Sequence, residues 1–146
     1  MTTFVLVHGS YQGGWIWQRV ATRLRSAGHT VYAPTMDGCA ERRHHLRPGI
    51  DTSTYVAEIA DLLFYEDLHD VVLVGTSSGG MVLCRTGELA RERISRVVFA
   101  DALALFDGET IGGIVTNRRN EATGSIGRLS PPASSGQTRL DSKRND

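Results

Sequence analysis

The segment at residues 71–81 constrains the fold of this chain more than any other part of the sequence. Four consecutive apolar residues run directly into Gly-Thr-Ser-Ser-Gly, and a helical pattern follows. A short, continuous apolar run is typical of a strand that is buried on both faces of a parallel sheet. The segment therefore predicts a strand, a tight turn at Ser77 and a helix, with the turn at the carboxyl edge of the sheet.

A Gly-x-Ser-x-Gly turn between a strand and a helix holds its serine hydroxyl exposed above the sheet. Gly75 and Gly79 suit such a turn, because a side chain at either position would collide with the neighbouring strand and helix. The backbone N–H of Ser78 points toward whatever Ser77 attacks, as one donor of an oxyanion hole does. Ser77 is therefore the candidate nucleophile, and Ser78 supplies the first candidate oxyanion donor.

Strand and helix patterns alternate along the first hundred residues. This alternation predicts an α/β protein in which a parallel sheet carries helices on both faces. Ligands bind such sheets at the carboxyl ends of the strands, so we expect the loops at residues 9–14, 76–80 and 101–107 to converge there. The predicted strands lie at residues 4–7, 30–33, 71–74 and 96–100, and the predicted helices at residues 15–27, 51–63 and 78–91.

The loop after the first predicted strand begins His8-Gly9-Ser10-Tyr11 and supplies a second candidate oxyanion donor, the backbone N–H of Ser10. Gly9 lets the backbone come close to a substrate. Two other interpretations remain open: a glycine-rich turn that binds nothing, and the dinucleotide loop of an NAD(P)-binding oxidoreductase. The second predicted strand ends without the acidic residue that holds a ribose hydroxyl, and the turn at Ser77 lacks the lysine of a phosphate-binding loop. We expect no cofactor and no metal.

Residues 4 to about 115 resemble the N-terminal half of an α/β-hydrolase. The branch they resemble includes plant methyl esterases, hydroxynitrile lyases and bacterial pyrethroid-hydrolase-like carboxylesterases. The resemblance implies that Ser77 is the nucleophile and that the amides of Ser10 and Ser78 form the oxyanion hole. Gly9, Tyr11 and His44 are the candidate substrate-binding residues. The segments that carry the resemblance are residues 4–10, 13–17, 33–38, 41–44, 67–75 and 77–82.

Three positions near the predicted nucleophile bear on the place of this chain within that branch. Hydroxynitrile lyases of the branch tend to carry a threonine where this chain has Gly9, so the resemblance favours ester hydrolysis over cyanohydrin cleavage. Thr76 stands where a histidine is frequent, and Ser78 where an aromatic residue or methionine is frequent. Both changes leave the turn feasible.

A serine nucleophile of this kind needs a histidine base and an acid, and in the family both follow the nucleophile in the chain. None of the five histidines follows His69. His8 leads the oxyanion loop and is structural in the family, whereas His44 and its neighbour lie in a polar loop near the mouth of the site. Asp101 follows the fourth predicted strand and is the candidate acid, with a loop or helix-cap aspartate as the alternative.

The composition changes after about residue 116. Residues 117–146 contain six basic residues, many Ser, Gly and Pro and no aromatic residue, so they cannot bury enough apolar surface to offset their ordering entropy. We expect residues 1–116 to be the N-terminal portion of an α/β-hydrolase domain, and residues 117–146 to be a disordered or non-homologous tail. Because family members are roughly twice this size, a truncated or frame-shifted, catalytically inactive product is the alternative to an active hydrolase.

The charge distribution and the cysteines indicate which binding partners and which cellular compartment to expect for this protein. The formal net charge is zero and charges of both signs are interspersed, which disfavours binding to nucleic acid or to an anionic membrane. Cys39 and Cys84 have no metal or disulfide spacing, and the N-terminus has no signal-peptide pattern, so we expect a cytoplasmic protein. The expected partners are a small-molecule ester and a second copy of the chain, paired through an exposed sheet edge at residues 96–100.

Overall fold

The structure, a computed structural model, describes residues 1–104 of the 146-residue chain. The predicted boundary at residue 116, the predicted tail at residues 117–146 and the end of the loop at residues 101–107 lie outside these described residues.

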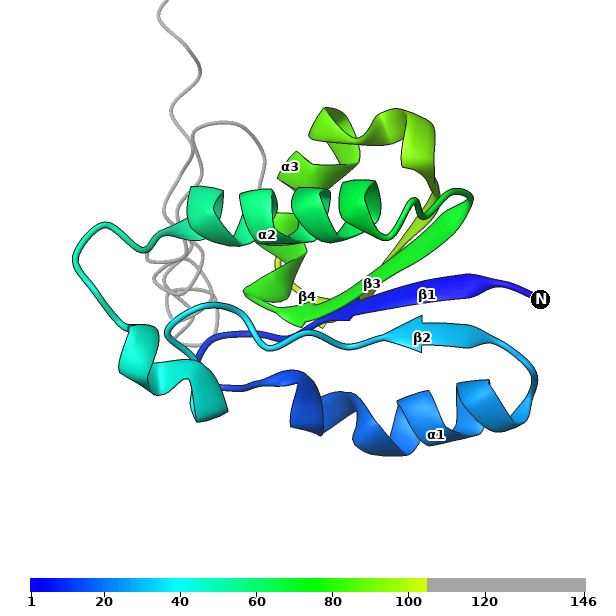
Figure 1. The fold of residues 1–146 in the computed structure, drawn as a ribbon, viewed down its shortest axis with the longest axis horizontal. Coiled ribbons are helices and arrows are strands. Elements are labelled where there is room, and N and C mark those ends of the chain that lie inside the picture. The colour runs from blue at the N-terminus through cyan, green and yellow to red at the C-terminus, as the bar shows by residue number, and fades with distance from the viewer. Residues whose placement is uncertain (105–146) are drawn as a thin grey trace, which may run out of the picture. The chain divides into compact units, whose positions relative to one another are not determined.

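The described residues form a parallel sheet of four strands in the order β2-β1-β3-β4. An α-helix lies in each of the three connections between consecutive strands, from β1 to β2, from β2 to β3 and from β3 to β4 (Figure 1). The predicted α/β class and parallel sheet are confirmed. The strands are β1 (Thr3–Val7), β2 (Thr30–Tyr32), β3 (Val71–Ser77) and β4 (Ile94–Ala102), and the helices are α1 (Gln18–Ser26), α2 (Thr52–Tyr65) and α3 (Gly79–Leu89).

Helices cover both faces of the sheet, α1 on one face and α2 with α3 on the other (Figure 1). Alternate residues of β1 serve the two faces: Val5 and Val7 pack toward α2 and α3, and Leu6 packs toward α1. This division explains why β1 reads as a continuous apolar run, since a strand covered on both faces has no solvent side. Each face therefore has its own fully buried cluster of side chains.

The three predicted helices are present, and the range of one of them needs a correction. Asp51 caps α2 by accepting from the Thr54 N–H at 3.1 Å, and the Thr54 hydroxyl accepts from the Asp51 N–H in return. The predicted helix at residues 15–27 is divided, because a 3-10 turn (Gly14–Trp17) precedes α1. The buried side chains of this segment include Trp17 and Ala21, whereas Val20 is 43% exposed.

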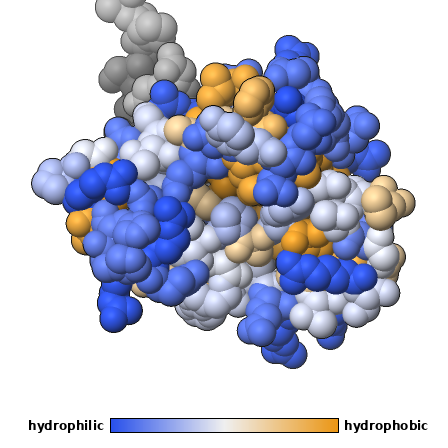
Figure 2. Space-filling view, viewed as in Figure 1, coloured by the Kyte–Doolittle hydropathy of each residue, from blue (hydrophilic) through white to orange (hydrophobic). Residues whose placement is uncertain are grey.

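Strand β4 is one edge of the described sheet, and β2 is the other. Val97, Val98 and Phe99 of β4 are 38%, 41% and 42% exposed, so apolar side chains lie at this edge within residues 1–104. Hydrophilic residues cover much of the face seen in Figure 2, and hydrophobic residues emerge near its centre. Pairing of this edge with a second copy stays a prediction. No helix of the described residues is long and apolar enough to cross a membrane.

Candidate active site

Ser77 is the last residue of β3 and has a positive φ of 51°. The next residue, Ser78, has returned to helical angles (φ −64°, ψ −14°) and begins α3. A left-handed conformation costs a non-glycine residue roughly 1–2 kcal/mol, so the surrounding structure must hold it in place. The predicted sharp turn is therefore present, and it leaves the Ser77 side chain exposed at the carboxyl edge of the sheet.

Backbone contacts hold this turn where it is. A Cβ on Gly79 would lie 2.7 Å from the carbonyl oxygen of His8, and one on Gly75 would lie 2.5 Å from Leu83 Cδ1. The carbonyl of Ser77 accepts from the Leu103 N–H at 2.9 Å, which ties the turn to the end of β4. The steric role predicted for Gly79 is thereby confirmed against the backbone at the end of β1, whereas at Gly75 the close contact is with the Leu83 side chain of α3.

The strain at Ser77 leads to a prediction about stability. The free energy of unfolding of Ser77→Gly is expected to be about 1 kcal/mol higher than that of Ser77→Ala, because glycine adopts a positive φ without steric cost. Urea denaturation of the two variants measures the difference. Ser95, in β4, has no positive φ and is the control position. There Ser95→Gly should be less stable than Ser95→Ala. If the glycine variant is the more stable one at both positions, the strain at Ser77 is contradicted.

The loop after β1 lies directly against the turn. A Cβ on Gly9 would lie 2.7 Å from Ser77 Cβ and 3.1 Å from Ser77 Oγ. The Ser10 N–H donates to Ser78 Oγ at 2.8 Å, and the hydroxyls of Ser10 and Ser78 are also 2.8 Å apart. Four predicted site residues, from segments almost seventy positions apart, are thus brought together in one place.

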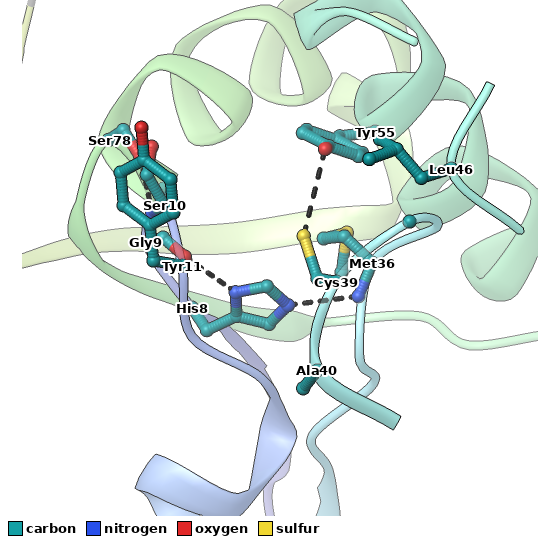
Figure 3. A pocket seen from close by; sticks show the side chains of 12 residues that line it. His8, Gly9, Ser10, Tyr11, Met36, Cys39, Ala40, Leu46, Tyr55 and Ser78 are labelled. Atoms are coloured by element: carbon teal, nitrogen blue, oxygen red, sulfur yellow. Dashed lines mark hydrogen bonds between the residues drawn. The ribbon is translucent and has the colours of Figure 1, made fainter. Parts of the chain in front are cut away.

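A cavity of about 450 Å³ opens beside the turn (Figure 3). Ser10 and Ser78 lie at one side of it, and Tyr55 and Leu46 lie at the other. Of the predicted residues, Gly9, Ser10, Tyr11 and Ser78 line the cavity, whereas Ser77 stands at its edge outside the lining. The other lining residues are His8, Met36, Gly38, Cys39, Ala40, Leu46, Tyr55 and Gly79.

The far side of the cavity holds a polar pair that the sequence analysis missed. The Tyr55 hydroxyl and the Cys39 thiol lie 3.7 Å apart, a distance at which a thiol is a weak partner. Burial, with a smaller contribution from Cys39, raises the pKa of Tyr55 to about 12. The hydroxyl is therefore protonated at any ordinary assay pH and can donate a hydrogen bond into the cavity.

His8 is buried and both of its ring nitrogens are engaged. Nε2 accepts from the Met36 N–H at 2.9 Å, so the proton is assigned to Nδ1, which donates to the Gly9 carbonyl at 2.7 Å. Burial lowers the pKa of His8 and keeps the ring neutral. The histidine thus clamps the oxyanion loop to the segment after β2, in agreement with the structural role that the resemblance implied.

The remaining histidines are engaged elsewhere. His45 pairs with Asp37 at 2.9 Å, and His44, which was a predicted substrate-binding residue, packs against the His45 ring outside the cavity lining. His29 and His69 lie just before β2 and β3, at the opposite ends of these strands from the turn, and β3 alone spans about 20 Å. Within residues 1–104, no hydrogen bond joins a histidine to Ser77.

Asp37 anchors the loop that forms one wall of the cavity. Its carboxylate accepts from Arg47, from His45 at 2.9 Å and from Arg42 at 3.3 Å. The hydrogen bond from Arg47 lowers the pKa of Asp37, and His45 and Arg42 add to this effect. The ionised carboxylate therefore holds together the charged loop that the sequence analysis treated as merely polar.

Asp101, the candidate acid, lies in the irregular end of β4. Ser77 pairs with Ala102, after a shift in register that follows the pair of Gly75 with Phe99. Asp101 is exposed and has a positive φ of 50°. It is therefore close in the sheet to the turn, but none of the described histidines pairs with it, and its role as the acid stays a prediction.

Comparisons with known proteins agree with this architecture. The family model described as the alpha/beta hydrolase family matches residues 4–143. The carbendazim hydrolyzing esterase of Nocardioides sp. (strain SG-4G) is 36% identical over 111 residues, which are 76% of this chain and 46% of that protein. The match to the family model continues past residue 116, where the sequence analysis placed a boundary.

Two solved structures share the fold. An extracellular alpha/beta-hydrolase from a Paenibacillus species is 30% identical with a TM-score of 0.69, covering 86% of this chain and 53% of that chain. Polyneuridine aldehyde esterase, a protein of Rauvolfia serpentina, is 31% identical with a TM-score of 0.69, covering 84% and 48%. The chain thus spans about half the length of the proteins it matches.

Proposed function

This chain belongs to the alpha/beta hydrolase family, several of its relatives are esterases, and from that membership we propose that Ser77 is the nucleophile of a serine esterase. One observation carries the proposal. The strained turn at Ser77 lies against Gly9 and next to the amides of Ser10 and Ser78, beside a cavity of about 450 Å³. Strain of this kind at an exposed serine is typical of a functional site.

The proposed chemistry is acyl transfer. Ser77 Oγ bonds to the carbonyl carbon of an ester while its proton passes to a base, and the carbonyl oxygen becomes an oxyanion that the N–H groups of Ser10 and Ser78 stabilise. Collapse of this intermediate breaks the bond to the alkoxy group, which leaves as an alcohol with the proton. Water then hydrolyses the acyl-serine by the same steps, releasing a carboxylic acid.

The cavity favours a small, largely apolar ester, lactone or thioester. Met36, Leu46 and the ring of Tyr55 supply apolar surface, and the Tyr55 hydroxyl can donate to one acceptor atom of the substrate. A threonine at position 9, as in the lyases of the resembling branch, would bring its Cβ to 2.7 Å from Ser77 Cβ. This close contact explains why position 9 is a glycine here, and the resemblance of that glycine to the esterases of the branch favours ester hydrolysis over cyanohydrin cleavage.

The base is the part of this mechanism that the described histidines do not supply. Without a base, a serine site of this type keeps roughly 10³–10⁴-fold catalysis over water, and the loss of the base costs about 10⁶ in the rate of a well-studied protease. A catalytically inert ligand-binding domain is therefore the second candidate, favoured by the engagement of His8 and His45 with other groups.

Labelling with a fluorophosphonate in the presence and absence of imidazole tests the proposal. Ser77 is exposed, so free imidazole can reach its hydroxyl and take the place of a histidine base. We expect slow labelling that imidazole accelerates, with mass spectrometry placing the adduct at Ser77. A folded chain that stays unlabelled in both conditions would favour the inert candidate.

A further inference from the structure

One predicted oxyanion donor is already occupied by a side chain of the protein. The Ser10 N–H donates to Ser78 Oγ at 2.8 Å, so the hydrogen that would stabilise an oxyanion already has an acceptor. The Ser10 hydroxyl also lies 2.8 Å from Ser78 Oγ and holds it from a second side. An N–H carries one proton, so a carbonyl oxygen and Ser78 Oγ compete for it.

The position of Ser78 makes this arrangement unusual for a serine at the start of a helix. An N-cap serine ordinarily has extended backbone angles, and its hydroxyl accepts from an N–H of the first helical turn. Ser78 precedes α3 with helical angles, and its side chain makes no cap hydrogen bond. Its hydroxyl reaches instead across to the loop after β1, a hydrogen bond that a methionine at this position could not make.

We propose that the Ser78 hydroxyl is an internal plug of the oxyanion hole, which a substrate carbonyl must displace before Ser77 can attack. The proposal rests on the proposed function, since the hole is defined by the nucleophile. Rotation about the Ser78 Cα–Cβ bond moves the hydroxyl away from the Ser10 N–H and frees the hole without any movement of the backbone. Only a ligand with an acceptor oxygen at this point compensates for the lost hydrogen bond, so the plug disfavours ligands that lack a carbonyl or oxyanion there.

Binding of phenylboronic acid measures the competition. The boron atom accepts an electron pair from Ser77 Oγ, the serine proton goes to solvent, and one oxygen of the tetrahedral boronate enters the oxyanion hole. One neutral hydrogen bond is at stake, so Ser78→Ala is expected to lower the dissociation constant by roughly two- to tenfold. Ser10→Ala keeps both its own amide and the Ser78 hydroxyl, and is expected to change the constant by less than Ser78→Ala does.

Amide hydrogen exchange measured by NMR on the same proteins tests, without any ligand, whether the Ser78 hydroxyl protects the Ser10 N–H. The Ser10 amide proton should exchange with solvent several-fold faster in Ser78→Ala than in the parent, and remain protected in Ser10→Ala. Weaker or unchanged boronate binding by Ser78→Ala would overturn the plug and point to a third oxyanion donor or a bystander. If no protein binds the boronate, the proposed function fails, and the exchange of the Ser10 amide still decides whether Ser78 occupies the hole.

Discussion

Ser77→Ala is expected to reduce fluorophosphonate labelling to the level of the denatured protein, with or without imidazole. The phosphonyl group is transferred when a serine oxygen bonds to phosphorus and fluoride leaves, and alanine has no oxygen to offer. The hydroxyls of Ser10 and Ser78 lie at the same edge of the cavity. Labelling of Ser77→Ala therefore also tests whether either of them is the reactive group. In the structure they are hydrogen-bonded to each other, whereas Ser77 lies at the strained turn.

Two controls make this result specific. Ser77→Ala keeps the Cβ that packs beside Gly9, and we expect its free energy of unfolding to stay within about 0.5 kcal/mol of the parent. Ser95→Ala, at the opposite end of β4 from the partner of Ser77, should label like the parent. An adduct that persists in Ser77→Ala and maps to Ser10 or Ser78 would move the nucleophile and refute the assignment made here.

Gly79→Ala is expected to destabilise the fold by roughly 1–3 kcal/mol, the usual cost of overpacking a close contact. The added Cβ would lie 2.7 Å from the carbonyl oxygen of His8 and 3.0 Å from that of Val7. Both atoms belong to backbone at the end of the central strand β1 and cannot rotate away. The start of α3 must therefore move off the sheet, and labelling of Ser77 should fall with it.

Gly87 in the same helix is the matched control. A Cβ there would meet only Val97 Cγ2, at an ordinary 3.8 Å. Alanine is the better helix former by roughly 0.5–1 kcal/mol, so Gly87→Ala should raise the free energy of unfolding. Urea denaturation of both variants is expected to give changes of opposite sign. Equal changes would show that the close contact at Gly79 does not hold α3 against β1.

The site was predictable wherever backbone geometry decides it. The strand before Ser77, the glycines at 75 and 79 and the loop at Gly9 can be recognised in the sequence, because each answers a steric need of the turn. The positive φ of Ser77 and the contact of Gly9 with its side chain agree with that interpretation. Sequence spacing alone was sufficient here, since these contacts lie at the ends of adjacent strands.

Side-chain partnerships were not predictable in the same way. Tyr55 has the spacing of a core residue of α2, yet its hydroxyl faces Cys39 across the cavity, because the loop after β2 folds back over the helix. The hydrogen bonds of His8 to Gly9 and Met36 depend on a loop conformation that no local pattern encodes. The hydrogen bond from the Ser10 N–H to Ser78 Oγ likewise depends on the rotamer of Ser78, which cannot be predicted from composition.

The close approach of α3 to β1 has a consequence for how such a protein can change over evolutionary time. The proposed nucleophile, Ser77, is positioned by contacts between backbone atoms, through Gly79 against Val7 and His8. The opposite wall of the cavity is made of side chains from the loop after β2 and from α2. Mutations at Cys39, Leu46 or Tyr55 can therefore alter which ligands fit without displacing the reactive group. If Ser77 is the nucleophile as proposed, changes in ligand preference and changes in reactivity map to different parts of the fold, and the first can occur without the second.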